Sequence, residues 1–384
     1  MSLKIITIVN GFGYGGIERT LLRCLALFDR GAFEHYICCF SAEGPLKSRY
    51  LSWIHGVHRM LKSGLLFLDI VQMLYVCCRV KPNVVHSRFG FSSGGVVLAA
   101  WLIRVPVIVS IHSEKSTMLS SSNSACIIFL KSLYVKVHMW ITLNCSTAIV
   151  GHSENNLNAY CNNWRNNDKF VLIYNGIDII ELNMKRAQAR SDLGLSVRKQ
   201  YILHVGSFRM EKNHILLIKI FGDIRKRSDR VELLLVGDGP LRPEIEDVVR
   251  FNGLTNVVHF LGQRDDVSAF YAAADVFLFP SYSEGLGNVV IEAQLNKLPV
   301  ICSRIPALME ALAPVQHANM FDLNNTDYAV HIVESVLLKG LDSDSLETSK
   351  QFVISRFDVR SMAASLERLY LSLQNRRYVD AHVI

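Results

Sequence analysis

The chain has 384 residues, half of them hydrophobic, and a formal net charge of +7. This length allows two domains of ordinary size, each with its own core. No run reaches the roughly 18 apolar residues of a membrane-spanning helix, so the sequence predicts none. The nine cysteines are scattered without C-x-x-C spacing, which predicts reduced core residues rather than a zinc or redox centre.

The basic excess lies in one half of the chain. Residues 1–180 carry 17 Lys and Arg against 9 Asp and Glu, whereas the remainder carries 24 against 25. This asymmetry favours an anionic partner for the first half, either a membrane surface or a phosphate-bearing substrate. Nucleic acid is disfavoured because no helix carries a basic stripe and basic residues do not interleave with aromatic ones.

In the first half, short apolar runs alternate with helical patterns. The chain opens on a run that lacks a small-residue cleavage site, which predicts a first strand rather than a signal peptide and a cytoplasmic protein. Strands are predicted at residues 3–9, 35–40, 83–87, 106–112, 146–151 and 170–175. Such alternation is typical of a parallel sheet with helices on both faces.

A glycine-rich loop follows the first predicted strand. Gly11, Gly13 and Gly16 have G-x-G-x-x-G spacing before a helix, and the acidic residue Glu43 lies beyond the next strand. This is the weak form of the dinucleotide fingerprint, in which glycines let the backbone approach a ligand. A nicotinamide-dependent oxidoreductase is therefore one alternative.

A long apolar segment lies between the fourth and fifth predicted strands. Residues 125–143 are apolar on most sides but contain Lys131, Lys136 and His138. The segment is either a buried helix of the first domain or a helix whose basic edge rests on a membrane interface.

After residue 178 the pattern loosens and then begins again. Strands are predicted at residues 201–206, 231–237, 257–262, 276–280 and 299–303. We therefore expect an α/β protein with two Rossmann-like domains facing each other across a cleft. The expected bounds are 1–178 and 190–356, with a final helix in 357–384 that crosses back to the first domain.

The second domain carries the residues with the clearest chemistry. Arg209 and Lys212 follow a strand, where cations suit a pyrophosphate in a doubly wound sheet. The apolar run 276–279 predicts a strand, 280–287 a loop and a helix that begins near Asn288. Glu284 then lies on the loop, and Glu292, one turn into the helix, can accept hydrogen bonds from a ribose diol.

Five motifs together resemble a known family. They are "GYGGIER" at 13–19, "YNGID" at 174–178, "VGSFRMEKN" at 205–213, "VGDGPLRPEIE" at 236–246 and "SEGLGNVVIEA" at 283–293. On these motifs, which span nearly the whole chain, the protein resembles a retaining glycosyltransferase of family four with the two-domain GT-B fold. The resemblance implies transfer of a sugar from a UDP- or GDP-sugar to an acceptor hydroxyl, without a metal ion or other cofactor.

The resemblance also implies roles for individual residues. Arg209 and Lys212 would hold the donor diphosphate, and Glu292 the ribose. Glu284 and the amides of Gly285, Leu286, Gly287 and Asn288 would hold the transferred sugar and phosphate, with Gly15 and Gly16 contributing from the first domain. His112, at a strand end, would contact the donor sugar, and His86 is a weaker candidate for that role. Family members often have Arg where this chain has Ser207, so Arg209 is expected to serve instead.

The expected acceptor is a glycan on a lipid carrier, as in cell-surface polysaccharide or lipopolysaccharide synthesis, and the expected location is cytoplasmic and peripheral on the inner membrane face. Two further alternatives remain open. Two glutamates can also serve as the acid and base of a glycosidase, although a hydrolase has no use for a diphosphate site. A catalytically inactive assembly partner could keep the same fold.

Overall fold

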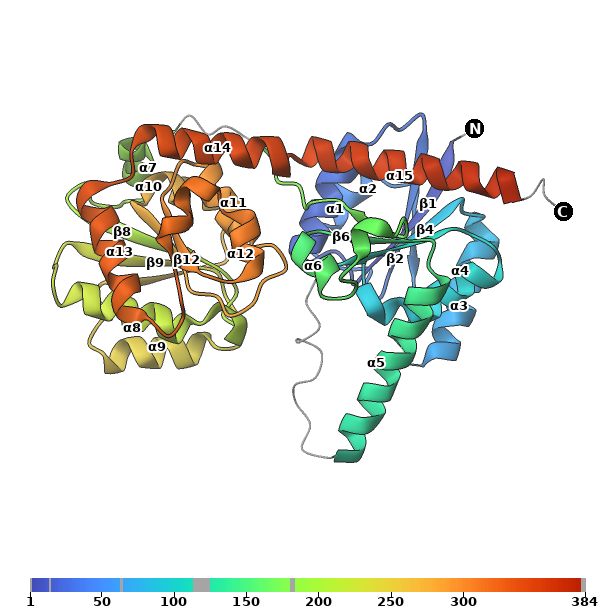
Figure 1. Ribbon diagram of the computed structural model, residues 1–384, viewed down its shortest axis with the longest axis horizontal. Helices are drawn as coiled ribbons and strands as arrows, with labels where there is room; N and C mark the ends of the chain where they lie inside the picture. Colours follow the sequence, from blue (N-terminus) through green and yellow to red (C-terminus); the bar gives the residue numbers. More distant parts are fainter. Residues whose placement is uncertain (1, 14, 63–64, 113–124, 180–183, 381–384) are drawn as a thin grey trace. The chain divides into compact units, whose positions relative to one another are not determined.

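A computed structural model describes residues 2–13, 15–62, 65–112, 125–179 and 184–380. The chain divides into two compact units (Figure 1). Unit 1 comprises Met1–Asp178 and Val359–Ile384, and unit 2 comprises Ile179–Asp358. Each unit is a parallel sheet covered by helices, which confirms the predicted α/β class with two Rossmann-like domains.

Unit 1 contains a sheet of seven parallel strands in the order β3-β2-β1-β4-β5-β6-β7. Its strands are β1 (Leu3–Val9), β2 (Phe33–Cys39), β3 (Gly56–Arg59), β4 (Val84–Ser87), β5 (Val107–Ile111), β6 (Ala148–Gly151) and β7 (Phe170–Leu172). The predicted runs match six of these strands. The sequence analysis did not predict β3, a four-residue edge strand in which no residue is fully buried.

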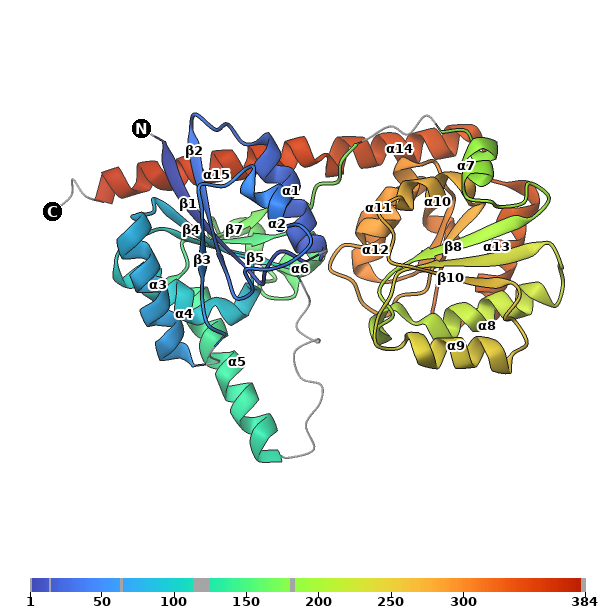
Figure 2. The ribbon, with the colours of Figure 1, turned by 180° about the vertical axis from the view of Figure 1, so that it is seen from behind.

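Helices cover both faces of this sheet (Figures 1 and 2). They are α1 (Gly16–Leu27), α2 (Lys47–Leu51), α3 (Leu66–Val80), η1 (Gly90–Ser93), α4 (Gly94–Leu102), α5 (Ala125–Cys145), α6 (Glu154–Asn158) and η3 (Trp164–Asn166). Leu21 and Leu25 of α1 pack into one apolar core, whereas Met73 of α3 and Val97 of α4 pack into another. The helix predicted at 125–143 is α5; its residues His138 and Ile141 are buried, whereas Trp140 is exposed. Its described side chains are therefore buried on one side only.

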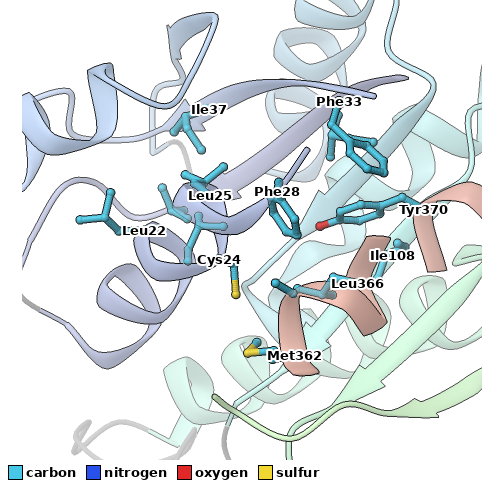
Figure 3. Close-up of a cluster of buried hydrophobic side chains, with 14 of the residues drawn as sticks. Leu22, Cys24, Leu25, Phe28, Phe33, Ile37, Ile108, Met362, Leu366 and Tyr370 are labelled. Atoms are coloured by element: carbon cyan, nitrogen blue, oxygen red, sulfur yellow. The ribbon is translucent and has the colours of Figure 1, made fainter. Parts of the chain in front are cut away.

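The final helix, α15 (Val359–Asp380), belongs to unit 1, as predicted. Met362, Leu366, Tyr370 and Leu373 form a buried stripe at helical spacing against the core that contains Phe28 and Phe33 (Figure 3). The Tyr370 hydroxyl lies 2.8 Å from Nδ1 of the buried His86. A glycine is required where the chain returns to unit 1, because a Cβ on Gly176 would lie 2.3 Å from Cα of Val359.

Unit 2 contains six parallel strands in the order β10-β9-β8-β11-β12-β13. These are β8 (Gln200–Val205), β9 (Val231–Val236), β10 (Val258–Gly262), β11 (Val276–Phe279), β12 (Val300–Ser303) and β13 (Met320–Phe321). The five predicted runs match β8 to β12, and β13 is a two-residue edge strand that was not predicted.

The helices of unit 2 connect these strands and follow the last one. They are α7 (Arg186–Asp192), η4 (Met210–Lys212), α8 (His214–Arg225), α9 (Arg242–Phe251), α10 (Val267–Ala273), α11 (Asn288–Leu295), α12 (Pro306–Ala311), η5 (Pro314–Asn319), α13 (Thr326–Lys339) and α14 (Ser343–Phe357). The main apolar core lies between the sheet and α8, α9 and α13.

Each sheet has one point where the strand order reverses. In unit 1 it lies between β1 and β4, and in unit 2 between β8 and β11. Doubly wound sheets bind ligands at the carboxyl ends of the strands beside this point, because the loops leave in opposite directions there. We therefore expect ligand-binding residues directly after β1 and β4 in unit 1 and directly after β8 and β11 in unit 2.

We expect truncation of the α15 stripe to destabilise unit 1. Leu366 is 1% exposed, so Leu366→Ala should lower the free energy of unfolding by about 2–5 kcal/mol through lost burial and a residual cavity. Leu371 on the same helix is 44% exposed, and Leu371→Ala should change it by less than about 0.5 kcal/mol. Denaturant titration measures both values. Equal effects would show that the buried stripe does not hold the helix.

Candidate functional site

Two oppositely charged side chains meet at the switch point of unit 2. Lys212 ends the short helix η4 after β8, and Glu284 lies on the loop after β11. The Lys212 ammonium donates a hydrogen bond to Oε1 of Glu284, and both side chains are mostly buried. The structure thus brings together two predicted site residues that are separated by 72 positions.

A serine that the sequence analysis missed holds this pair in place. Ser281 is fully buried, and its hydroxyl lies 2.7 Å from Glu284 Oε1 and 2.7 Å from the Glu211 carbonyl oxygen. The Tyr282 amide donates to the same Glu211 carbonyl at 2.8 Å. The loops after β8 and β11 are therefore joined by hydrogen bonds directly beside the ion pair.

His204 and His214, which lie near Lys212, are neutral. The Lys212 ammonium is therefore the positive charge among these three side chains. That ammonium lies 5.1 Å from the centre of the Phe279 ring. The buried His214 stacks on Phe208 at 4.2 Å, and burial followed by the charge of Lys212 lowers its pKa to about 4. Burial likewise holds the pKa of His204 well below its usual value.

The start of α11 faces the same loop. The helix begins at Asn288, as predicted, but the residue in the N-cap position is Gly287 with φ +84°. A Cβ on Gly287 would lie 2.5 Å from Cδ2 of Leu308, so both the backbone angle and the close contact require glycine. The amides of the first turn of a helix have no partner within the helix and favour an anion. Leu286 is buried and anchors the loop, and Gly285 is partly buried.

Glu292, one turn into α11, is oriented by a tyrosine that the sequence did not indicate. The Tyr271 hydroxyl of α10 donates to Oε2 of Glu292 at 3.1 Å and lies 3.3 Å from the Val289 carbonyl oxygen. Burial and the neighbouring carboxylate raise the pKa of Tyr271 well above its usual value. Tyr271 therefore remains a protonated hydrogen-bond donor that orients the carboxylate of Glu292.

The remaining predicted residue of unit 2, Arg209, is exposed and immediately precedes η4. Ser207, two positions earlier, is also exposed. The loops after β8 and β9 cross at close range, since a Cβ on Gly237 would lie 2.0 Å from the Gly206 carbonyl oxygen. This crossing fixes the backbone from which Arg209 projects.

In unit 1, Gly15 and Gly16 are exposed at the start of α1, where Gly15 is the N-cap. His112 directly follows β5 and stacks on His152 at 4.4 Å. Burial, with smaller contributions from His152 and Arg88, keeps the pKa of His112 well below its usual value, so the ring is neutral near pH 7. Its Nε2 atom has no hydrogen-bond partner among the described residues.

His86 differs from His112 although both follow the same sequence pattern. It is fully buried, and its two ring nitrogens lie 2.8 Å from the Tyr370 hydroxyl and 2.8 Å from the Ser110 hydroxyl. This environment makes it a residue of the core of unit 1. Arg88, two positions later, was not singled out from the sequence, yet its guanidinium is buried without a partner in the described part of the chain.

The described residues contain no group of three or more His, Cys, Asp and Glu side chains that could hold a metal ion. Two aspartates with D-x-D spacing, Asp342 and Asp344, are candidates for a metal site by sequence alone. Asp342, however, caps α14 by accepting a hydrogen bond from the Ser345 amide at 2.8 Å. Glu43, the acidic residue considered for a ribose in unit 1, forms an exposed ion pair with Lys47 at 2.7 Å.

Comparison with known proteins identifies the class to which this fold and site belong. The family model described as "Glycosyltransferase Family 4" matches residues 14–181, and that described as "Glycosyl transferases group 1" matches residues 185–353. The chain belongs to this family of glycosyltransferases and is a transferase with the GT-B fold. This assignment supersedes the oxidoreductase and glycosidase alternatives.

Individual relatives agree with the family. The putative glycosyltransferase EpsF of Bacillus subtilis (strain 168) is 33% identical over 318 residues, which cover 78% of this chain and 79% of EpsF. N-acetyl-alpha-D-glucosaminyl L-malate synthase of Bacillus anthracis is 24% identical over 78% of this chain and 77% of its own length.

Solved structures share the fold. Anabaena Alr3699/HepE in complex with UDP superposes with a TM-score of 0.78 at 18% identity, covering 97% of this chain and 100% of that one. WaaG, a glycosyltransferase involved in lipopolysaccharide biosynthesis, gives a TM-score of 0.73 at 17% identity, covering 95% and 99%.

We expect Gly287→Ala to destabilise unit 2 more than an alanine at an equally strained but open position. Gly253 has φ +68°, and a Cβ there would meet nothing within 4 Å, so Gly253→Ala carries only the backbone cost of about 1–2 kcal/mol. Gly287→Ala adds the collision with Leu308. Denaturant unfolding of both variants measures the difference, and equal losses would mean that Leu308 moves aside freely.

Proposed function

We propose that the protein transfers a sugar from a UDP- or GDP-sugar to a hydroxyl of a lipid-linked glycan and retains the anomeric configuration. The observation that carries this proposal is the Lys212–Glu284 pair beside the start of α11. A cation, a carboxylate and a helix N-terminus at one switch point suit a ligand that has both phosphates and hydroxyls. Membership of the glycosyltransferase family and the UDP complexes of structural neighbours support this reading.

In this mechanism, the Lys212 ammonium leaves its ion pair with Glu284 and binds the donor diphosphate. The bond between the anomeric carbon and the phosphate oxygen breaks, and the amides of residues 285–288, Lys212 and Arg209 stabilise the charge on the departing diphosphate. The acceptor oxygen forms the new bond to the anomeric carbon, and its proton passes to a phosphate oxygen of the leaving group. One well-placed donor to a developing anion contributes about 10²–10³ in rate. Because the protein supplies these positive groups itself, the mechanism requires no metal ion.

The two glutamates have different tasks in this proposal. Glu284, released from Lys212, contacts the hydroxyls of the transferred sugar. Glu292, whose carboxylate is oriented by Tyr271, accepts hydrogen bonds from the ribose. Within unit 1, His112, whose ring is neutral, is assigned to sugar binding, and the amides at Gly15 and Gly16 to phosphate binding. Exclusion of water from the site protects the donor from hydrolysis.

The site is tested by a donor screen. A panel of UDP- and GDP-sugars is incubated with membrane extract as the acceptor source, and products are identified by mass spectrometry and the anomeric configuration by NMR. We expect one donor to be used with retention. Lys212→Met and Glu284→Gln should each lower kcat by about 10²–10³, because they remove charge from the reacting centre.

The exposed Lys219 on α8 provides the matched control. Lys219→Met should leave turnover unchanged. Near wild-type turnover in both Lys212→Met and Glu284→Gln, with the fold intact by circular dichroism, would contradict the site. An inverted product would contradict the retaining mechanism alone.

We also infer that unit 1 docks on an anionic membrane surface, where a lipid-linked acceptor would be found. No helix in the described ranges is long and apolar enough to cross a bilayer. Yet large apolar side chains are exposed on three neighbouring helices of unit 1: Phe67, Leu68, Val71 and Tyr75 of α3, Trp101 and Leu102 of α4, and Leu133, Val137 and Trp140 of α5. The three helices pack closely: a Cβ built on Gly95 of α4 would lie 2.6 Å from Cβ of Asp69 on α3, and one built on Gly94 would lie 2.9 Å from Cα of His138 on α5.

The charges around this apolar face favour lipid over a protein partner. Between Met60 and His112 the only acidic residue is Asp69, whereas the exposed Lys62, Arg79, Lys81 and Arg104 are basic. Lys136 adds an exposed cation on α5. Aromatic and aliphatic side chains flanked by cations are typical of a surface that enters the headgroup region of an anionic bilayer.

Vesicle cosedimentation tests this docking. We expect binding to vesicles of phosphatidylglycerol and phosphatidylcholine but not to phosphatidylcholine alone. The triple change Phe67→Ser, Trp101→Ser and Trp140→Ser should reduce the bound fraction at least tenfold by removing buried apolar area. Phe251→Ser, at a position of unit 2 that is 92% exposed, is the control and should bind normally. Unchanged binding of the triple variant, or dimerisation through this face in light scattering, would contradict the inference.

A further inference from the structure

Arg88 is a buried cation without a counter-ion among the described residues. It follows directly after β4, and its backbone amide donates to the Ile8 carbonyl of β1 at 3.2 Å. The residue is 2% exposed, and Nε, Nη1 and Nη2 have no hydrogen-bond partner in the described part of the chain. An unpaired buried charge is strongly unfavourable, so a protein that keeps one has a reason to do so.

A second buried arginine of the same chain shows what a structural role requires. Arg190 of unit 2 is 6% exposed. Its guanidinium donates to the Ala273 carbonyl at 2.9 Å, the Lys199 carbonyl at 3.2 Å and the Asp275 carboxylate at 2.6 Å. All three of its nitrogens are used. Arg88 has a similar degree of burial and none of these contacts.

No described group around Arg88 forms a hydrogen bond with its guanidinium. This holds for Glu18 of α1, whose charge acts on Tyr50 together with that of Arg88. Burial, as the largest cause, keeps the pKa values of His86, His112 and His152 below their usual range, so these rings are neutral near pH 7. The charge of Arg88 also opposes the rise in the pKa of Cys24 on α1. The two other charges that act on Cys24, Arg23 and Asp178, are paired with each other at 2.8 Å.

The position of Arg88 in the fold is that of a ligand-binding residue. β1 and β4 flank the switch point of unit 1, and the loop after β1 leads to the exposed first turn of α1 at Gly16. Arg88 is two residues beyond His86, whose ring contacts Tyr370 of α15, so it extends on the sheet face that α1 and α15 cover. A guanidinium and the first turn of α1, where the Glu18 carboxylate lies 2.2 Å from a Cβ built on Gly15, are thus at the same end of the sheet.

We propose that Arg88 binds a phosphate group of a substrate at the switch point of unit 1, together with the first turn of α1. The proposal rests on the proposed function for the identity of that substrate, since a nucleotide-sugar donor and a lipid-linked acceptor both carry phosphates. A planar guanidinium with five N–H donors matches two phosphate oxygens at once. The bound phosphate then forms the ion pair with the Arg88 guanidinium that no described residue provides.

The test uses stability and anion binding, which do not depend on turnover. Melting temperatures are measured for the full chain, Arg88→Met and Arg190→Met, each without ligand. Because Arg88→Met removes an uncompensated buried charge, it should melt at or a few degrees above the wild-type temperature. Arg190→Met removes the buried partner of Asp275 and should melt at least about 5 °C lower.

Binding is then measured with inorganic pyrophosphate in a Lys212→Met background, which removes the cation of the unit 2 site. We expect Arg88→Met to weaken pyrophosphate binding at least tenfold in calorimetry and Arg88→Lys to restore part of it. A melting temperature that falls as in Arg190→Met, or pyrophosphate binding that is unchanged, would overturn the proposal.

Calorimetry with UDP and with GDP in the presence of Lys212 separates the two sources of phosphate. Weaker binding of the preferred nucleotide by Arg88→Met assigns Arg88 to the donor diphosphate. Unchanged nucleotide binding with lost pyrophosphate binding assigns it to the phosphate of the acceptor. If the chain binds neither nucleotide, the proposed function fails, but the pyrophosphate result still decides whether Arg88 holds an anion.

Discussion

The ion pair between Lys212 and Glu284 depends on one constraint, the reversal of strand order between β8 and β11. Parallel strands place their carboxyl ends on one edge, and the reversal leaves room there for side chains from both loops. Ser281 and the Glu211 carbonyl then hold the loops at a fixed separation. Without this constraint, residues 72 positions apart would have no reason to meet, and the site would not exist.

Each unit has a cation at the switch point of its sheet, and the two cations differ in whether the chain provides a counter-ion. In unit 2 the cation at the switch point, Lys212, forms an ion pair with the carboxylate of Glu284. In unit 1 the cation, Arg88, has no such partner among the described residues.

The apolar character of unit 1 has two separate origins. The stripe of α15 is buried against the sheet, with Tyr370 hydrogen-bonded to His86, and it stabilises the fold. The outer side of α3, α4 and α5 is equally apolar but faces solvent, and its neighbours are basic rather than acidic. Surface of that kind is costly in water, which is why we connect it with a bilayer rather than with folding.

The sequence by itself determined the α/β class, most strands and the residue types of the unit 2 site, because buried parallel strands are continuous apolar runs and glycines mark their loops. It missed β3 and β13, since short edge strands carry no such run. Only the tertiary structure separated His86 from His112, whose sequence patterns are alike, and revealed the contacts of Ser281 and Tyr271 and the burial of Arg88. The reason is physical: burial and partners depend on residues far away in the chain, and local sequence contains no record of them.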